Sequence, residues 1–143
     1  MPLTNYTTSV AADRTIAKIT KLLVKAGARD IGLRYDEQGH ATALNFALRV
    51  HGDYQAYRLP VRIGAVQDQL KLDRVERRYL TLDHSEKVAW RIIEDWLRAQ
   101  LAIMATGMVK FDEVMFPYLI LDRGETVYDR YEISNQLPAG SAS

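Results

Sequence analysis

Residues 31–62 alternate between apolar and polar positions in three consecutive stretches, which predicts three β-strands. The stretches read IGLRY, TALNFALRV and YQAYRLPVR. Strict alternation is typical of half-buried strands, because successive side chains point to opposite faces of a sheet. The turns between the stretches, at 36–40 and 51–53, are short and polar and each contains a glycine. We therefore expect an antiparallel meander with one apolar face.

The second face of this predicted sheet is the feature of the chain that most strongly suggests a function. It combines basic and aromatic side chains with small alanines: Arg34, Asn45, Arg49, Tyr54, Arg58 and Arg62. Arginines neutralise backbone phosphates, and a tyrosine ring stacks on an unpaired base. Pro60 cannot donate to a ladder, so the third strand is expected at an edge or near its end.

An amphipathic helix is predicted before the meander, at about 11–26. Ser9 or Asp13 is the expected N-cap, and Gly27 is the expected stop. Four basic residues recur at helical spacing on its polar side: Arg14, Lys18, Lys21 and Lys25. Such a row suits either phosphate contacts or an ordinary solvated helix face.

The clearest helix is predicted at 84–106. Asp83 and Ser85 are both credible caps, and Gly107 stands at the C-terminal stop position. Its apolar stripe consists of Val88, Ile92, Trp96, Ala99 and Ile103, widened by Ala89, Ile93, Leu97 and Met104. The expected solvent side holds Lys87, Arg91, Glu94, Asp95 and Arg98. Trp90 falls off the main stripe, where core or interface packing is its expected role.

Between the strands and this helix, residues 63–79 predict a weaker helix that ends in clustered arginines. The cluster contains Arg74, Arg77 and Arg78 beside Tyr79. It suits phosphate binding with base stacking, and equally a connector that is salt-bridged to nearby acids.

After the long helix we expect a short helix at 111–119 that Pro117 breaks, then a small hairpin turning at 122–124. The predicted fold is therefore α+β, with a three-stranded antiparallel meander packed by an N-terminal helix and a long C-terminal helix. One domain is expected over 1–135, followed by a disordered tail at 136–143.

The amino-acid composition excludes several classes of function. The 143 residues include no cysteine, which excludes disulfides, thiolate chemistry and cysteine-ligated metals. No signal peptide or membrane-spanning run is evident, so the cytoplasm is the expected location. Residues 1–80 carry 13 Lys/Arg and 8 Asp/Glu, whereas residues 81–143 carry 6 and 10. A polyanion would therefore meet the front half, unless the asymmetry is chance.

No catalytic or cofactor motif is found. The three histidines, His40, His51 and His84, form no ligand pattern with carboxylates. There is no glycine-rich phosphate loop, no GxSxG and no HExxH motif. We expect a protein that is not an enzyme and that needs neither a cofactor nor a metal ion.

The chain resembles a family of small, largely uncharacterised proteins encoded by bacteriophages and prophages. The likeness runs through YTTSVAADRTIAKITKLLVKAGA, IGLRYD, ATALNFALRV, RLPVR, VAWRIIEDWLRAQLAIMATGMVKFDEVMFPYLIL and GETV. It implies a phage or mobile-element setting inside a host cell, a shared fold and no catalytic residue. The order of a helix, three strands and a helix is also similar to double-stranded RNA-binding domains and to the Rad52-like core of single-strand annealing proteins, which work as oligomeric rings.

Two functions follow as hypotheses. The first is non-catalytic nucleic-acid binding, with single-stranded DNA favoured, as a binding protein or annealing accessory. The alternative is a protein-binding inhibitor of a host defence system or an adaptor of a replication complex. Its docking patch, or mimic of nucleic acid, would be acidic: Asp112, Glu113, Asp122, Glu125 and Asp129. A third possibility is sequestration of small nucleotides in an oligomeric interface.

Overall fold

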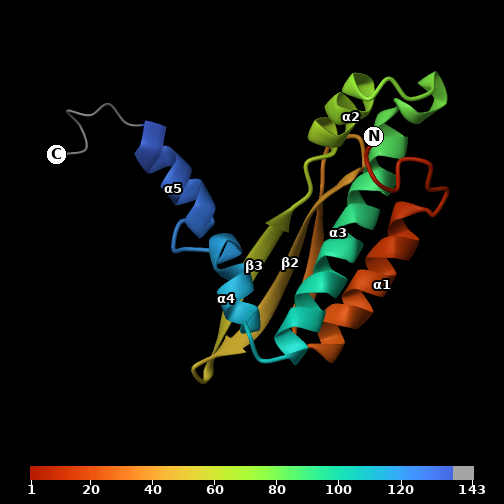
Figure 1. The fold of residues 1–143 in the computed structure, drawn as a ribbon. Helices are drawn as coiled ribbons and strands as arrows, with labels where there is room; N and C mark the ends of the chain where they lie inside the picture. Colours follow the sequence, from red (N-terminus) through yellow and green to blue (C-terminus); the bar gives the residue numbers. More distant parts are fainter. Residues whose placement is uncertain (137–143) are drawn as a thin grey trace.

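A three-stranded antiparallel sheet lies at the centre of the fold (Figure 1). The structure is a computed structural model, which describes residues 1–136. Its strands are β1 (Arg29–Tyr35), β2 (Ala41–Val50) and β3 (Asp53–Pro60), in the order β1-β2-β3. The predicted meander and the α+β class are confirmed, and Pro60 ends the edge strand β3, where no ladder donor is needed.

Two long helices, α1 (Ala12–Lys25) and α3 (Leu82–Ala105), pack against each other on one face of the sheet. The connection from β3 to α3 contains α2 (Ile63–Leu72) and the 3-10 turn η1 (Arg77–Tyr79). The C-terminal segment contains α4 (Phe111–Met115), the 3-10 turn η2 (Phe116–Tyr118) and α5 (Val127–Gln136). Pro117 lies in η2, where the predicted break between helices occurs.

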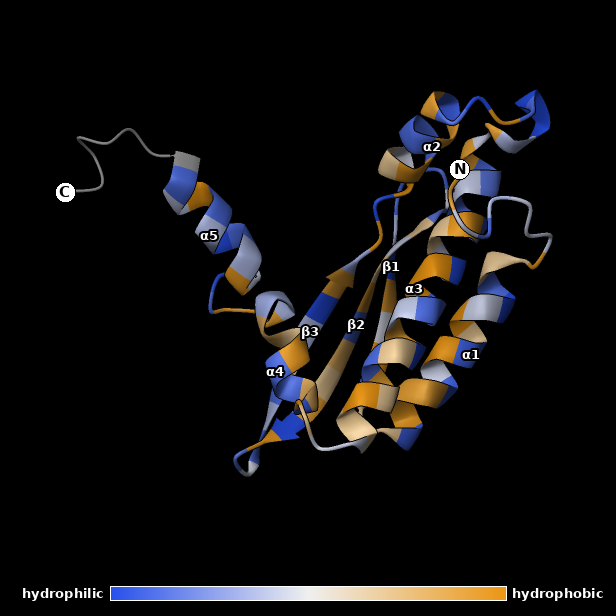
Figure 2. Cartoon of the chain, viewed as in Figure 1, coloured by the Kyte–Doolittle hydropathy of each residue, from blue (hydrophilic) through white to orange (hydrophobic). Residues whose placement is uncertain are grey.

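The hydrophobic core lies between the sheet and these two helices. Figure 2 shows hydrophobic colouring along β2, and hydrophobic bands on α1 and α3 that alternate with hydrophilic ones. The largest side chains with under 2% exposure include Trp90, Tyr57, Phe46, Ile19, Leu23, Leu44 and Leu97. Each such side chain contributes roughly 1.5–3 kcal/mol relative to an exposed one. Phe111 of α4 stacks on Phe46, so the C-terminal segment closes one end of this core.

The predicted glycine stops are confirmed, but the predicted N-caps are wrong. Gly27 and Gly107 both follow a helix with positive φ, at 98° and 80°. Ala11 caps α1 without a side-chain hydrogen bond. Thr81 caps α3 and accepts from the backbone N–H of His84 at 3.1 Å. The residues expected as caps were Ser9, Asp13, Asp83 and Ser85, of which the last three lie inside the helices.

The buried side of α3 is also shifted from the predicted stripe. Glu94, expected in solvent, is 4% exposed and accepts two hydrogen bonds from Arg98, at 3.0 and 2.8 Å. Ala99 and Ile103, expected in the stripe, are exposed. The reason is that α3 packs against both α1 and α2 and also reaches β2 through Trp90, so its buried side is not a single stripe. Trp90 is fully buried in the core, as expected.

The predicted C-terminal hairpin is only partly present. Ile120 and Thr126 form an isolated bridge around the expected turn, but residues 127–136 are the helix α5. A capping box explains the helix. The Thr126 backbone N–H donates to the Asp129 carboxylate at 3.0 Å, and the Asp129 N–H donates to Thr126 Oγ1 at 3.1 Å. Of the predicted tail, 137–143 lies outside the described residues.

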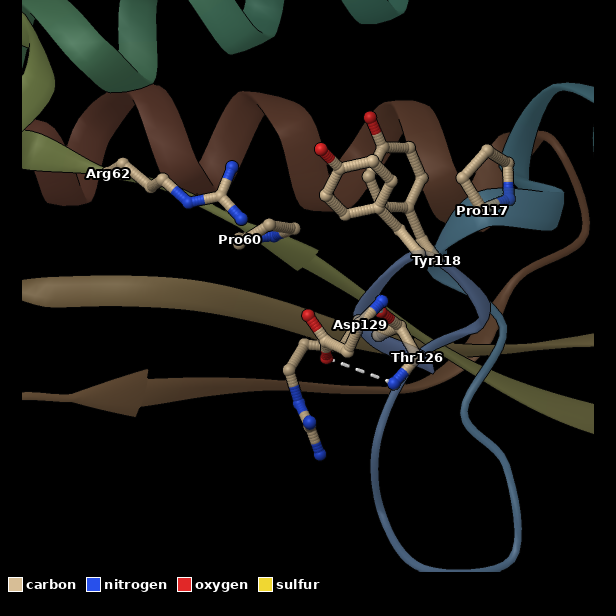
Figure 3. A pocket seen from close by; sticks show the side chains of 8 residues that line it. Pro60, Arg62, Pro117, Tyr118, Thr126 and Asp129 are labelled. Atoms are coloured by element: carbon tan, nitrogen blue, oxygen red, sulfur yellow. Dashed lines mark hydrogen bonds between the residues drawn. The ribbon is translucent and has the colours of Figure 1, made fainter. Parts of the chain in front are cut away.

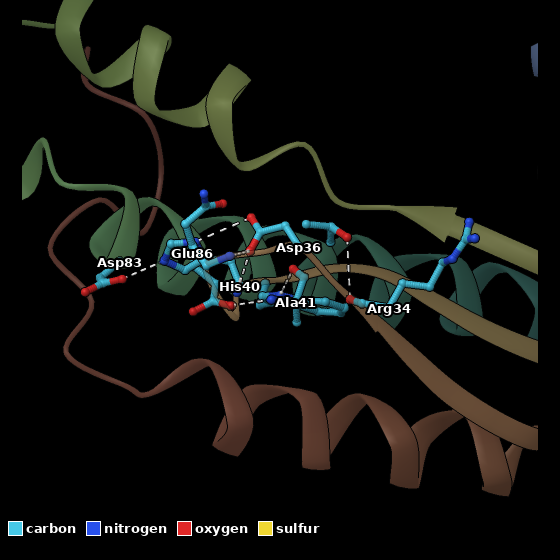
Figure 4. Close-up of polar contacts among 9 residues, drawn as sticks. Arg34, Asp36, His40, Ala41, Asp83 and Glu86 are labelled. Atoms are coloured by element: carbon cyan, nitrogen blue, oxygen red, sulfur yellow. Dashed lines mark hydrogen bonds and ion pairs between the residues drawn. The ribbon is translucent and has the colours of Figure 1, made fainter.

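A buried histidine ties the turn between β1 and β2 to α3 (Figure 4). His40 Nε2 lies 2.6 Å from Asp83 Oδ1, and its Nδ1 lies 3.5 Å from Asp36 Oδ2. Beside it, the Ala41 backbone N–H donates to Glu86 Oε2 at 2.6 Å. The hydrogen bond to Asp83 raises the pKa of His40, which burial partly opposes. His40 is therefore buried, at 8% exposure, although it stands in a short polar turn.

Removal of the indole hydrogen bond of Trp90 should destabilise the fold. Trp90 Nε1 donates to the Ala41 carbonyl at 3.1 Å in the core. Trp90→Phe leaves that carbonyl without its donor, so we expect the free energy of unfolding in urea to fall by about 1–3 kcal/mol. The matched control is Trp96→Phe, at a half-buried position of the same helix. An equal loss in both variants would contradict this role.

The stabilising effect of His40 should decrease with rising pH. A histidine whose pKa is raised on folding stabilises the native state fully below its unfolded pKa of about 6.5, and loses that effect as pH rises through the folded pKa. We expect His40→Gln to cost more unfolding free energy at about pH 5.5 than at about pH 8.5. His51→Gln, in the exposed turn, should show no such difference.

Candidate nucleic-acid interface

One face of the sheet is turned away from α1 and α3, and register determines which side chains share it. The pairs of β2 and β3 on this face are Ala43 with Pro60, Asn45 with Arg58, Ala47 with Ala56, and Arg49 with Tyr54. On β1, Gly32 lies opposite Asn45 and Arg34 lies opposite Ala43. We call this the open face; its polar members are Arg29, Arg34, Asn45, Arg49, Tyr54 and Arg58.

Arg29 joins the open face because of a β-bulge. It pairs with Ala47, whereas Gly32 pairs with Asn45, so three steps along β1 match two along β2. Asp30, inside the bulge, has a positive φ of 53°. Simple alternation from Leu33 would place Arg29 on the apolar face, which is why sequence periodicity misses it.

The end of the open face near the turn between β2 and β3 contains an arginine–tyrosine cluster. The guanidinium carbon of Arg29 lies 4.0 Å from the centroid of the Tyr54 ring, and Tyr54 is 46% exposed. Contacts with Tyr54 and Asp30 raise the pKa of Arg29. Exposed Arg49 lies directly opposite Tyr54. Arg29 is also paired with Asp30 at 3.3 Å, so this end presents an aromatic ring with one paired cation and with Arg49, which is unpaired within residues 1–136.

Toward the other end of the open face, Arg58 forms a hydrogen bond within the protein. Its Nη1 donates to the Gly124 carbonyl at 2.8 Å and so holds the loop before α5 against β3. Burial lowers the pKa of Arg58, and the nearby charge of Arg34 adds to this effect, while Asp129 opposes it. Arg58 is thus partly engaged by the protein itself.

Arg34 and Arg49 are the most available cations of this surface. Both are exposed, and neither forms an ion pair with a carboxylate of residues 1–136. Arg34 pairs with Ala43 and Arg49 lies six residues further along β2, roughly 20 Å at the rise of a strand. Cations therefore occur at both ends of the face.

The remaining predicted residues are not on the open face. Arg62 follows β3 as the N-cap of α2 and lies at the rim, beside Arg58. The cluster of Arg74, Arg77 and Arg78 lies in the connection between α2 and α3. Arg78 pairs with Glu76 at 3.1 Å, as a salt-bridged connector would. The basic row of α1 is exposed on the helix layer, which covers the opposite face.

The acidic residues of the C-terminal half have largely local partners. Glu113 accepts from the Lys110 backbone N–H at 3.2 Å, Glu125 pairs with Arg130, and Asp129 caps α5. The hydrogen bond from Thr126 lowers the pKa of Asp129, which therefore remains a carboxylate. Three of the five acids of the predicted docking patch thus have structural roles.

No three His, Cys, Asp or Glu side chains within 1–136 converge in a way that could hold a metal ion. No described helix combines the length and apolar character needed to cross a membrane. Comparisons with protein-family models, with curated proteins and with solved structures give no match to this chain.

The structural role of Arg58 gives a stability prediction. Arg58→Gln removes its charged hydrogen bond to the Gly124 carbonyl, so we expect a loss of roughly 1 kcal/mol in the free energy of unfolding. Arg49→Gln, on the same face without such a contact, should change it by less than about 0.5 kcal/mol. Urea denaturation measures the free energy of unfolding of both variants, and equal values would contradict the structural role of Arg58.

Proposed function

We propose that the open face binds the backbone of single-stranded nucleic acid, with DNA favoured, and that it does so without catalysis. The observation that carries this proposal is the placement of Arg34 and Arg49, exposed and free of ion pairs in residues 1–136, on a sheet face without a helix over it. Guanidinium groups in this setting retain their capacity to bind phosphate oxygens.

The aromatic component favours a single strand over a duplex. Tyr54 is nearly half exposed and stands among arginines, as stacking residues do in grooves that track a strand. A broad sheet face cannot enter the major groove, which admits a helix or a two-stranded ribbon. Unpaired bases, by contrast, are free to stack on the ring.

Binding should depend on salt and on the free arginines. We expect a labelled single strand of roughly 30 nucleotides to bind at low salt, with log affinity falling linearly in log salt. Arg34→Gln with Arg49→Gln should weaken binding and reduce the slope by roughly 0.7 for each phosphate contact removed. Arg58 is left unchanged, because its loss also disturbs the loop. Fluorescence anisotropy measures both quantities.

The matched control removes the same charge elsewhere. Arg74→Gln with Arg77→Gln changes two exposed arginines outside the open face and should leave the slope unchanged. Equal slopes for the two double variants would contradict the proposed surface. If no strand binds at low salt, the proposal is wrong, and a host or phage protein becomes the partner to test by pull-down from host lysate.

A further inference from the structure

A cavity of about 180 Å³ lies where the C-terminal segment meets the edge of β3 (Figure 3). Two segments far apart in sequence form it, since Leu119 bridges to Tyr57 and the Ile120 N–H donates to the Ala56 carbonyl at 2.9 Å. The residues that carry the argument are Pro60, Arg62, Pro117, Tyr118, Tyr128 and Asp129. Arg58 belongs both to this lining and to the open face.

The size and walls of the cavity suit a flat ring. A protein cavity of about 150 Å³ is large enough for benzene. Pro60 and Pro117 contribute pyrrolidine rings, and Tyr118 and Tyr128 contribute aromatic rings. The indole of Trp96 meets Tyr118 edge-on at 6.4 Å between centroids, which limits the movement of that ring. The other lining residues, Arg58, Arg62, Thr126 and Asp129, are polar or charged. Flat, partly rigid walls combined with convergent polar groups are usual for small-ligand sites.

The polar groups distinguish a base from a phosphate. Asp129 is a carboxylate whose pKa is lowered, so it repels an anion but accepts hydrogen bonds from N–H groups. Arg62 forms no ion pair in the described chain and only donates. A ligand here needs a flat ring with both N–H donors and acceptor atoms on its edges, which is the description of a nucleobase.

We propose that this cavity holds one base of a strand bound on the open face, and that it prefers guanine. This proposal rests on the proposed function, because Arg58 joins the cavity to the open face. Guanine presents two adjacent N–H donors, which suit a carboxylate. Asp129 Oδ2 already accepts from the Thr126 N–H at 3.0 Å, so the base would use Oδ1 and the second lone pair of Oδ2. It also presents O6 and N7 as acceptors, the pair to which an arginine binds in bidentate fashion.

The test compares two strands of roughly 15 nucleotides, one all thymine and one with a single central guanine. The wild-type protein should bind the guanine strand roughly tenfold more tightly in anisotropy titrations. Tyr128→Leu should abolish this preference, so that the guanine strand binds no more tightly than the all-thymine strand, because Tyr128 lines the cavity and lies outside the open face. Phe116→Leu, an exposed aromatic outside the lining, should retain the preference.

The outcomes separate this proposal from the proposed function. Equal affinity of the wild-type protein for both strands, or a preference that persists in Tyr128→Leu, would overturn the guanine site while leaving the open face intact. If neither strand binds, the open-face proposal fails, and dGMP then tests the cavity alone. Amide shifts on dGMP addition that gather at Arg62, Tyr118 and Tyr128 would support the cavity, and their absence would overturn it.

Discussion

The alternation of side chains along β2 is the constraint from which both the core and the open face follow. Leu44, Phe46 and Leu48 point into the helix layer and are almost fully buried. Their neighbours must then point to the other face, where register sets Asn45 against Arg58 and Arg49 against Tyr54. Because α1 and α3 both lie on the first face, the alternation along β2 determines which side chains enter the core and which point away from the helices.

The arginines of the open face are not equivalent, although they look alike in sequence. Arg58 stabilises the loop before α5 through Gly124 and is partly desolvated. Within residues 1–136, Arg34 and Arg49 form no ion pair, so their guanidinium groups stay available. A surface that binds a mobile polyanion needs cations of the second kind, because a guanidinium already engaged must give up a contact to take a phosphate. Substitutions at Arg34 and Arg49 therefore report on binding more cleanly than substitutions at Arg58.

The sheet, the two long helices and five of the six polar members of the open face could be predicted, since local periodicity determines them. The place of Arg29 on this face could not be predicted. The bulge at Asp30 shifts the alternation of side chains along β1 by one residue, and a bulge of this kind has no reliable sequence signal. The helix α5 could have been found from Thr126 and Asp129, whose spacing resembles a capping box. The cavity could not, because it depends on a bridge between Leu119 and Tyr57 that no local pattern reports.

The C-terminal segment makes the two ends of the open face chemically different. Near the turn between β2 and β3, Arg29 and Arg49 surround Tyr54, a setting that favours phosphates and stacking. At the other end, the hydrogen bond from Thr126 lowers the pKa of Asp129, and the charges of Arg62 and Arg58 lower it further. A carboxylate there weakens the local attraction for phosphate but adds an acceptor for base N–H groups. A single-stranded nucleic acid on this face would therefore be contacted at its backbone at one end and at one of its bases at the other.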